Sequence, residues 1–465
     1  MPADDRLDLS APRRVHIVGV GGAGMSAIAG VLARMGHTVT GSDLKDSRAI
    51  ARLRAAGIDA RVGHDAANVP ADADAVVIST AIPATNPEIV AAGAHGIPVL
   101  RRAEALRALV ATRRGIAVAG SHGKTTTSSM LALVLRGAGW RPTFLIGGDV
   151  NEVGTNAAYD DGEWMVVEAD ESDGTFLELP VEAAIVTNVE ADHLDHYGSF
   201  PALVDAFARF LAAVPGPRVV CADEPNAAAI AARVDARTYG FAPEAHYRIV
   251  RCDGGRHGSE VELTRDGAPL GTFSLPVPGV HNATNAVAAV AVATELGVGF
   301  ADIARALAGF GGVARRFEFR GEHDGVTLID DYAHLPSEVQ AALRTARAGG
   351  WDRVIAVFQP HRYSRTDSLW RDFADAFTDA DLVVLTDVYG AGETPRPGVT
   401  GRLLVRAVLD AHPAASVVYL PHRADVVSVV PRLARPGDVV LTLGAGDLTT
   451  VPDVWLGLDP EGATP

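Results

Sequence analysis

The segment AGSHGKTTTSS, residues 119–129, has the composition of a loop that binds nucleotide phosphates. Gly120 and Gly123 allow the backbone to close around phosphate oxygens, and Lys124 can reach the terminal phosphates. The hydroxyl of Thr125 suits coordination of Mg²⁺. This combination of residues predicts that the loop binds the triphosphate of ATP.

The lysine of this loop stands out because lysine is otherwise nearly absent. Of the 41 lysine and arginine residues, only Lys45 and Lys124 are lysines. A lysine in the glycine-rich loop of such a chain indicates a function that requires the compact ammonium group and that the bulkier guanidinium of arginine cannot perform. Val118 stands where a Walker A motif has its first glycine, so the motif here is a shorter form. The alternative is a tight turn with an ordinary surface lysine. The predicted ATP contacts of the loop are Gly120, Ser121, His122, Gly123, Lys124, Thr125 and Thr126.

A second glycine-rich turn, GVGGAG at residues 19–24, follows an apolar stretch near the N-terminus. A G-x-G-x-x-G turn directs backbone N–H groups and a helix N-terminus at a diphosphate. A chain that already binds ATP near residue 120 gains little from NAD, so we predict the diphosphate of another nucleotide. A turn that only packs a helix on a strand is the alternative. The predicted contacts are Gly19, Gly21, Gly22, Gly24, Ser42 and Asp43.

Two acidic clusters follow apolar stretches, EADESD at residues 168–173 and EADHLDH at residues 190–196. Carboxylates opposite a phosphate loop suit Mg²⁺, which takes a few protein oxygens and completes its shell with phosphate and water. A zinc site has less support, because no cysteine is near and the two histidines lack a recognised ligand spacing. Solvated loop acids are the alternative for most of these side chains. We predict functional roles for Glu168 and His193.

Amide and guanidinium side chains form a third set of candidates. Asn282 and Asn285, in PGVHNATNA, suit either contact with an adenine edge or capping of the helix that follows. The segments ARRF and QPHRYSRT carry planar, charged side chains that suit bidentate binding of phosphates or carboxylates. Their candidate residues are Arg315, Arg316, His361, Arg362 and Arg365.

The composition places these candidates in a globular protein with large cores. The 465 residues are 48% hydrophobic and 21% charged. The formal net charge of −16 argues against a general nucleic-acid surface. The acidic N-terminus predicts no signal peptide, no segment predicts a membrane span, and Cys221 and Cys252 alone predict no disulfide framework. We therefore expect a cytoplasmic protein, monomeric or homodimeric, without membrane insertion.

Short Val- and Ile-rich stretches alternate with Ala-rich stretches, which is the rhythm of doubly wound parallel sheets. This alternating pattern begins again after residue 110 and once more after residue 318. Residues 245–275 alternate more finely, which predicts an antiparallel patch. We predict three α/β domains, which are a Rossmann-like domain at residues 1–110, a central ATP-binding domain at 111–318 and a Rossmann-like domain at 319–465.

The chain also contains, in this order and over nearly its whole length, the motifs HIVGVGGAGMSAIA, GSHGKTTT, EADESD, TNVEADHLDHYGSF, PGVHNATNA, RRFEFRG, DDYAH and FQPHRYSRT. In these motifs the chain resembles the Mur ligases, and within them the alanine-adding members. The resemblance implies a P-loop ATPase-like central domain. It further implies that the first domain binds UDP-N-acetylmuramate, the central domain ATP with Mg²⁺, and the third domain L-alanine. The implied reaction forms an amide through an acyl phosphate, releases ADP and phosphate, and serves peptidoglycan precursor synthesis.

The resemblance also implies roles for single residues. Lys124 matches the lysine on the β- and γ-phosphates, and the implied magnesium ligands are Thr125, Glu168 and His193. Further nucleotide contacts are implied for Asn282, Asn285, Arg316 and Asp330. The implied amino-acid pocket consists of Tyr332, His334, His361, Arg362 and Arg365. Catalytic roles are implied for Lys124, His193 and His334.

Two positions depart from the family pattern. The family commonly has a second histidine where this chain has Leu335, so only His334 is available there. Related ligases use a carbamylated lysine beyond their metal-site histidine, but no lysine follows Lys124. No general base can be identified from the sequence.

Three other functions stay open at this point. One is a recycling ligase that adds a tripeptide to the same nucleotide, although FQPHRYSRT favours the alanine-adding reaction. Another is an NAD-dependent oxidoreductase, which rests on residues 19–24 alone. A nucleotide-binding protein without catalysis is disfavoured, because phosphate loop, metal candidates and arginine motif are all present.

Overall fold

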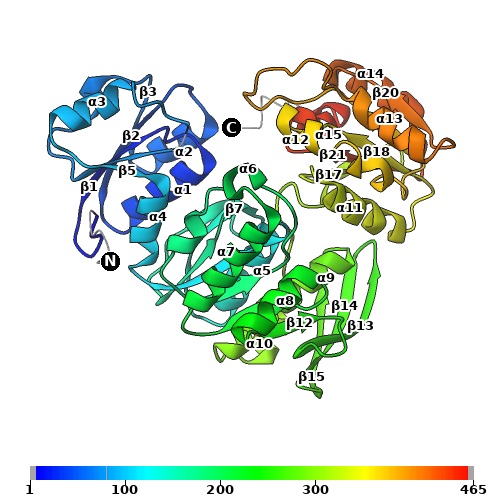
Figure 1. Cartoon of the computed structure of the whole chain (residues 1–465), viewed down its shortest axis with the longest axis horizontal. Coiled ribbons are helices and arrows are strands. Elements are labelled where there is room, and N and C mark those ends of the chain that lie inside the picture. The colour runs from blue at the N-terminus through cyan, green and yellow to red at the C-terminus, as the bar shows by residue number, and fades with distance from the viewer. Residues whose placement is uncertain (1–6, 80, 459–465) are drawn as a thin grey trace. The chain divides into compact units, whose positions relative to one another are not determined.

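The computed structural model describes residues 7–79 and 81–458, and Figure 1 traces the chain through its helices and strands. The chain forms two compact units. The first comprises the described residues up to Val250 together with Glu262–Phe273 and Thr284–Gly309. The second comprises Arg251–Val261, Ser274–Ala283 and the described residues from Phe310 onward.

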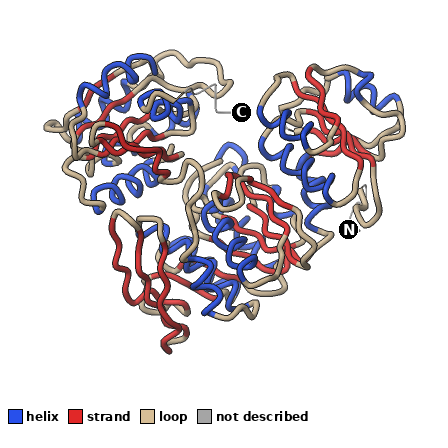
Figure 2. Tube along the Cα trace, turned by 180° about the vertical axis from the view of Figure 1, so that it is seen from behind, coloured by secondary structure: helices blue, strands red, loops and turns tan. Residues whose placement is uncertain are grey.

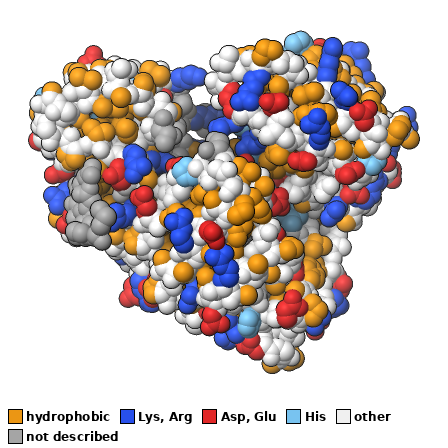
Figure 3. All heavy atoms as spheres, viewed as in Figure 1, with side chains coloured by type: hydrophobic (Ala, Val, Ile, Leu, Met, Phe, Trp, Pro, Cys, Tyr) orange, Lys and Arg blue, Asp and Glu red, His pale blue; other side chains and the backbone are white. Residues whose placement is uncertain are grey.

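Three sheets carry the α/β pattern, so the predicted fold class is confirmed. Within residues 7–79 and 81–458, no helix is long and apolar enough to cross a membrane. On the face drawn in Figure 3, acidic and basic side chains are interspersed.

A five-stranded parallel sheet lies at the start of the first unit. Its elements are β1 (Arg14–Val18), α1 (Ala23–Arg34), β2 (Thr38–Asp43), α2 (Arg48–Ala55), β3 (Asp59–Val62), the 3₁₀ helix η1 (Ala66–Asn68), β4 (Ala75–Ile78), α3 (Pro87–Ala94), β5 (Val99–Arg101) and α4 (Arg102–Val110). The strand order is β3-β2-β1-β4-β5, so the winding changes direction between β1 and β4. Doubly wound sheets bind ligands beyond the carboxyl ends of their strands at this switch point. The glycine turn at residues 19–24 lies there, directly after β1.

A ten-stranded sheet follows along the chain. Its elements are β6 (Arg114–Ala119), α5 (Lys124–Gly137), β7 (Thr143–Val150), β8 (Thr155–Ala158), β9 (Trp164–Glu168), η2 (Thr175–Glu178), β10 (Val181–Val186), α6 (Leu194–Tyr197), α7 (Phe200–Ala213), β11 (Arg218–Cys221), α8 (Pro225–Val234), β12 (Arg237–Gly240), β13 (Tyr247–Gly255), β14 (Gly258–Arg265), β15 (Ala268–Leu275), α9 (Val280–Glu295) and α10 (Phe300–Leu307). The strand order is β15-β14-β13-β12-β11-β10-β6-β9-β7-β8.

The pairing of β6 determines which loops meet at the carboxyl edge of this sheet. Strand β6 pairs in parallel with β10 on one side and with β9 on the other. The acidic clusters after β9 and β10 therefore flank the glycine-rich loop after β6, as expected for a phosphate and metal site.

A six-stranded sheet forms the core of the second unit. Its elements are β16 (Glu318–His323), β17 (Val326–Asp331), α11 (Pro336–Ala348), β18 (Val354–Phe358), α12 (Tyr363–Leu369), η3 (Asp372–Asp375), β19 (Leu382–Leu385), α13 (Arg402–Ala411), β20 (Val417–Tyr419), α14 (Arg423–Leu433), β21 (Val439–Leu443), η4 (Asp447–Thr450) and α15 (Val451–Trp455). The order is β16-β17-β21-β18-β19-β20, with β16 antiparallel to β17 and the other pairs parallel.

The continuous apolar sequence of β18 reflects burial of both faces of this sheet. Ala356 and Phe358 pack in one hydrophobic cluster with α11 and α13, whereas Ile355 and Val357 pack in a second cluster with α14 and α15. Figure 2 shows helices on both sides of these strands. Strands covered on both faces read as unbroken Val- and Ile-rich runs rather than alternating ones.

Candidate active site

Two glycines shape the loop between β6 and α5. The φ of Gly120 is +132° and that of Gly123 is +78°, a backbone conformation that glycine adopts readily and L side chains rarely adopt. A Cβ atom at Gly120 would lie 2.2 Å from Thr187 Oγ1, and one at Gly123 would lie 2.5 Å from Asn285 Oδ1. The loop backbone therefore packs directly against neighbouring segments and leaves no room for side chains at these positions.

Hydrogen bonds to the segment after β10 hold this loop in place. The N–H of His122 donates to Asn188 Oδ1 at 2.8 Å, and the N–H of Glu190 donates to Ser121 Oγ at 2.9 Å. The His122 ring lies beside Glu190, with 3.1 Å between Nε2 and Oε2. The side chains of Ser121 and His122 thus fix the loop, and the first backbone N–H groups of α5 are the natural phosphate donors.

Lys124 projects back over the loop from the first residue of α5. Its Nζ donates to the carbonyl oxygen of Gly120 at 2.6 Å and to both carboxylate oxygens of Glu171 at 2.9 Å. Burial alone would lower the pKa of Lys124, but the carboxylates of Glu171 and Glu168 raise it above its ordinary value. The ammonium group is therefore charged and held where a triphosphate would meet it.

Thr125 and Glu168 bring two oxygens together at the end of β9. Thr125 Oγ1 donates to Glu168 Oε1 at 3.2 Å, and the N–H of Gly147 donates to Glu168 Oε2 at 2.8 Å. Neighbouring oxygens around Mg²⁺, each about 2.1 Å from the ion, lie about 3.0 Å apart in octahedral geometry. The spacing and chemistry of these two oxygens fit a magnesium site.

His193, the third predicted metal ligand, lies at the start of α6 and pairs with its neighbour Asp192. Its backbone is left-handed, with φ of 54°, at the start of α6, and its Nε2 lies 3.4 Å from Asp192 Oδ2. Among the residues that the structure describes, no three His, Cys, Asp or Glu side chains are grouped to hold a metal ion. A metal at this edge would therefore depend on phosphate and water oxygens to complete its shell.

A cavity of about 180 Å³ connects the first glycine turn with the metal candidates. Its lining includes Gly24 at the start of α1, Arg102 of α4 and Glu168. Arg102 Nη2 lies 4.0 Å from Asp170 Oδ2 and 3.9 Å from Asp173 Oδ2. Sequence reasoning missed Arg102, because no motif separates it from the chain's many other arginines.

The first glycine turn is tied to the end of β2. The N–H of Gly19 donates to the carbonyl oxygen of Ser42 at 2.8 Å, and the N–H of Gly21 donates to Asp43 Oδ2 at 3.0 Å. The Ser42 side chain is fully buried, so its hydroxyl does not reach the surface as the predicted substrate contact requires. The structure instead gives Ser42 and Asp43 the task of shaping the turn, with Gly22 and Gly24 at the start of α1.

Ser42 belongs to a buried polar cluster that the sequence did not reveal. Its hydroxyl donates to Glu88 Oε2 at 2.6 Å, and Asn68 Nδ2 donates to Glu88 Oε1 at 2.7 Å. Burial alone would raise the pKa of Glu88, but hydrogen bonds with His16, Ser42 and Asn68 lower it to about 2. His64 completes the cluster, with 2.8 Å between its Nδ1 and Ser42 Oγ.

In the second unit, four of the predicted amino-acid contacts lie together after β17 and β18. The rings of Tyr332 and His334 meet edge-on with centres 5.4 Å apart, and those of His334 and His361 are 6.1 Å apart. Arg365 Nη1 lies 3.2 Å from His361 Nδ1. The sequence missed Tyr389, which follows β19 and stacks on His361 at 5.8 Å.

Arg362, the fifth predicted amino-acid contact, shapes this cluster mainly through its backbone. Its φ of 67° is left-handed, and its N–H donates to the carbonyl oxygen of Tyr389 at 2.8 Å. This geometry turns the chain into α12 and places Arg365 one helical turn further on, on the side of His361.

The arginines before β16 stack on Tyr332. Their Cζ atoms lie 4.8 Å (Arg315) and 5.1 Å (Arg316) from its ring centre, which is a cation–π distance. Asp330 is almost fully buried and accepts hydrogen bonds from Arg315 Nε, Thr442 Oγ1 and Thr449 Oγ1 at 3.3, 2.7 and 2.6 Å. Its carboxylate therefore stabilises the fold at this strand end, whereas the resemblance implied a nucleotide contact.

The next residue, Asp331, was not singled out from the sequence. Its carboxylate accepts the N–H groups of Phe317 and Ala333, each at 2.7 Å. Burial raises its pKa to about 6, against the opposing effect of Arg316.

The two asparagines of PGVHNATNA have different surroundings. Asn282 Nδ2 donates to the carbonyl oxygen of Pro278 at 2.7 Å, which ties the first turn of α9 to the preceding segment. Helix capping would instead require the side-chain oxygen to accept a backbone N–H group. Asn285 lies beside Gly123 of the phosphate loop. Leu335, at the position of the family's second histidine, is buried at 6% exposure and precedes α11.

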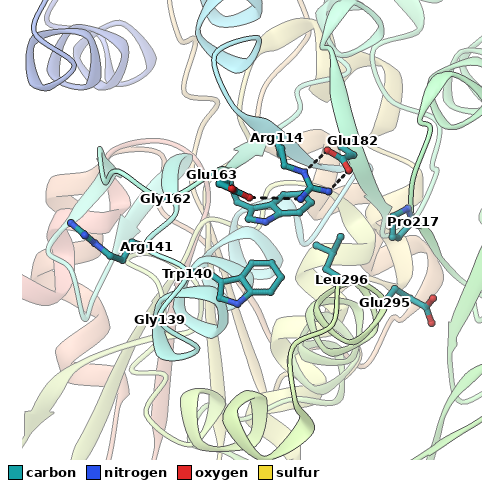
Figure 4. Close-up of a pocket in the computed structure, with 11 residues that line it drawn as sticks. Arg114, Gly139, Trp140, Arg141, Gly162, Glu163, Glu182, Pro217, Glu295 and Leu296 are labelled. Carbon is teal, nitrogen blue, oxygen red and sulfur yellow. Dashed lines mark hydrogen bonds and ion pairs between the residues drawn. The ribbon is translucent and has the colours of Figure 1, made fainter.

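A larger cavity, of about 680 Å³, opens where β6 and β9 begin and α5 ends (Figure 4). Arg114 is engaged by other lining residues, as its Nε donates to Glu182 Oε2 at 2.7 Å and its guanidinium lies 4.1 Å from the Trp164 ring centre. Trp140 stacks on Trp164 at 5.8 Å. Helix α5 has 14 residues, or about 21 Å at 1.5 Å per residue, and Lys124 is at its other end. This cavity is therefore remote from the phosphate loop.

Three family models match consecutive parts of the chain. They are the Mur ligase family catalytic domain at residues 14–114, the Mur ligase middle domain at 118–293 and the Mur ligase glutamate ligase domain at 315–446.

Individual relatives match over nearly the full length. A UDP-N-acetylmuramate–L-alanine ligase of Bradyrhizobium sp. (strain ORS 278) is 50% identical over 446 residues, covering 94% of this chain and 95% of that protein. The crystal structure of a UDP-N-acetylmuramate–alanine ligase from Thermotoga maritima has a TM-score of 0.81 at 30% identity, covering 96% of this chain and 98% of that chain. A murein peptide ligase from Psychrobacter arcticus shares the fold, with a TM-score of 0.68 at 24% identity and coverage of 96% and 98%.

Proposed function

The chain belongs to the Mur ligase family, and we propose that it joins L-alanine to the lactyl carboxylate of UDP-N-acetylmuramate with cleavage of ATP to ADP and phosphate. The products are UDP-N-acetylmuramoyl-L-alanine, ADP and phosphate. The observation that carries the proposal is 50% identity over 94% of the chain to a ligase of that name. The murein peptide ligase, which represents the recycling alternative, is more distant in both identity and TM-score than the alanine ligase from T. maritima. ATP and UDP-activated sugars are cytoplasmic metabolites, so we place the reaction in the cytoplasm.

In the first step, the lactyl carboxylate attacks the γ-phosphorus of ATP, ADP leaves and an acyl phosphate remains. The Lys124 ammonium, held between the Gly120 carbonyl and Glu171, offsets the negative charge on the transferring phosphoryl group. Thr125 and Glu168 would hold Mg²⁺, which neutralises phosphate charge when bound. The cavity that Gly24, Arg102 and Glu168 line supports a route for the substrate carboxylate to this edge.

In the second step, the amine of L-alanine attacks the acyl carbon, and phosphate leaves from a tetrahedral intermediate. Arg365 suits the alanine carboxylate, because its planar fork binds carboxylates bidentately. The rings of Tyr332, His334 and His361 lie next to one another beside it, with neighbouring ring centres 5.4 and 6.1 Å apart, and we assign the alanine methyl group to this aromatic cluster.

An omission experiment tests this proposal. Release of ADP and phosphate from Mg·ATP would be measured with UDP-N-acetylmuramate and L-alanine, and each component would be left out in turn. We expect turnover only when all are present. Turnover that requires the tripeptide in place of alanine would replace this function with recycling, and no turnover with either would refute ligation by this chain.

A further inference from the structure

The hydrogen bonds of His334 determine which of its ring nitrogens carries the proton. Its Nδ1 lies 3.1 Å from the carbonyl oxygen of Tyr332 and 3.2 Å from Glu338 Oε2. Both atoms only accept hydrogen bonds, so Nδ1 must donate and carry the hydrogen. Burial lowers the pKa of His334 below its ordinary value, although Glu338 opposes this shift. A neutral ring with hydrogen on Nδ1 leaves a lone pair on Nε2.

His361 has the opposite tautomer. Its Nδ1 lies 3.2 Å from Nη1 of Arg365, a nitrogen that only donates, so Nδ1 of His361 accepts and its hydrogen is on Nε2. Burial, followed by the nearby His334 and Arg365, lowers the pKa of His361 to about 4. Two neighbouring imidazoles thus offer different chemistry, one a proton acceptor and the other a hydrogen-bond donor.

We infer that Nε2 of His334 is the general base that takes a proton from the ammonium group of alanine, and that Glu338 is the positioning residue that holds this tautomer. The inference rests on the proposed function, because it requires alanine in this pocket. His361 Nε2–H and Arg365 are left to bind the alanine carboxylate. Leu335 supplies no second imidazole that competes for the proton.

The proton balance of this step is complete within the reactants. One N–H bond of the ammonium breaks as its proton binds Nε2 of His334, and the freed lone pair attacks the acyl carbon. The second proton leaves with the phosphate as the C–O bond breaks, and the third stays on the amide nitrogen. The imidazolium that forms lies beside the Glu338 carboxylate, which stabilises its charge.

The other charged groups around His334 oppose its protonation before substrate binds. Arg365 of α12 and Arg316, before β16, both disfavour an imidazolium at this site, and His361 lies next to it. Glu338, at the start of α11, favours the imidazolium and is the largest charged influence on the pKa of His334 after burial. Burial and the two arginines outweigh Glu338, so His334 is unprotonated at neutral pH and can accept a proton from alanine.

Hydroxylamine provides the deciding test, because it is already uncharged at neutral pH and attacks an acyl phosphate without a general base. In His334→Gln, an acceptor oxygen replaces Nε2 but cannot take up the proton. We expect alanine-dependent turnover to fall about 100-fold, while hydroxamate formation from UDP-N-acetylmuramate, Mg·ATP and hydroxylamine stays within about threefold of wild type. His412→Gln, which changes an exposed histidine paired with Asp375, is the matched control and should leave both rates unchanged.

The outcomes of this test separate two failures. Equal loss of the alanine and hydroxylamine reactions in His334→Gln would overturn the general-base role. Wild-type enzyme that forms hydroxamate but never uses alanine would overturn the proposed function, and the base role with it. Raising the pH should restore the alanine reaction of His334→Gln, by about tenfold per pH unit below the amine pKa.

Nitrogen NMR of the histidine rings tests the tautomers without turnover. The His334 signal, assigned by its loss in His334→Gln, should show hydrogen on Nδ1, and the His361 signal should show hydrogen on Nε2. Glu338→Gln keeps an oxygen to accept the N–H groups of His334 and Leu335, so α11 should still form. We expect this variant to mix the His334 tautomers and lower kcat about tenfold with little change in the alanine KM. Hydrogen on Nε2 of His334 in the wild type, or an unchanged kcat in Glu338→Gln, would overturn the inference.

Discussion

Gly123→Ala tests the phosphate loop with the addition of a single methyl group. At this position φ is +78°, and a Cβ atom would lie 2.5 Å from Asn285 Oδ1. Gly139, just beyond the other end of α5, has φ of +79° and open space around its Cα. The two substitutions therefore impose the same backbone strain, of about 1–2 kcal/mol for alanine in the left-handed region. Only Gly123→Ala adds a clash.

The size of the clash predicts the size of the kinetic effect. Ordinary contact begins near 3.4 Å, so Asn285 or the loop must move by about 0.9 Å, the difference between 3.4 and 2.5 Å. A misplacement of about 1 Å in a group that positions reactants costs about 100-fold in rate. We expect kcat/KM for ATP to fall by about that factor in Gly123→Ala and to stay near the wild-type value in Gly139→Ala.

Coupled ADP-formation kinetics and thermal unfolding together check this expectation. Both variants should lower Tm by a few degrees, because both carry the strained backbone. Full activity in Gly123→Ala would refute the assignment of this loop to ATP. Equal loss of activity in Gly139→Ala would attribute the effect to stability rather than to the loop.

Four further predictions follow from the same structure. Lys124→Ala should abolish ADP formation, whereas Lys45→Ala, at the only other lysine, should retain it, and activity in the former would remove the central role of the loop. Glu168→Gln should raise the Mg²⁺ concentration needed for half-maximal rate, and an unchanged requirement would move the metal elsewhere. Arg365→Ala should raise the KM for alanine more than that for ATP, and equal effects would indicate a nucleotide role. Glu88→Gln removes a carboxylate whose pKa is lowered from 4.5 to about 2 in the folded protein. The ionised carboxylate of Glu88 therefore contributes its full stabilisation above about pH 4.5, and this stabilisation is lost as the pH falls towards 2. The difference in urea midpoint between wild type and Glu88→Gln should narrow over this pH range. A constant difference would contradict the stabilising role of the hydrogen bonds that Glu88 makes with His16, Ser42 and Asn68.

The sequence predicted the loops of this protein better than the partners of their side chains. The phosphate loop could be predicted from Gly120, Gly123 and the strand before them, because the conformation of a local turn depends on residues that are adjacent in the sequence. The counter-ion of Lys124 could not be chosen in the same way. Several carboxylates follow β9 and β10, and only the pairing of these strands with β6 selects Glu171.

Buried polar clusters were missed for a related reason. Ser42 and Glu88 are far apart in the chain and meet only once β1, β2 and α3 are packed, so the sequence suggested a surface role for Ser42. Tyr389 and Glu338 lie outside the recognised motifs, and their importance depends on the ring and the nitrogen that they face. The tautomers of His334 and His361 follow from these distances and from nothing in the sequence.

The most direct test of the account follows oxygen from one substrate into one product. UDP-N-acetylmuramate labelled with a heavy oxygen isotope in its lactyl carboxylate would be turned over with Mg·ATP and L-alanine, and the phosphate would be analysed by mass spectrometry. Attack of the carboxylate on the γ-phosphorus predicts that each phosphate released carries one labelled oxygen. Unlabelled phosphate would contradict the acyl phosphate, and with it the roles assigned to Lys124 and His334.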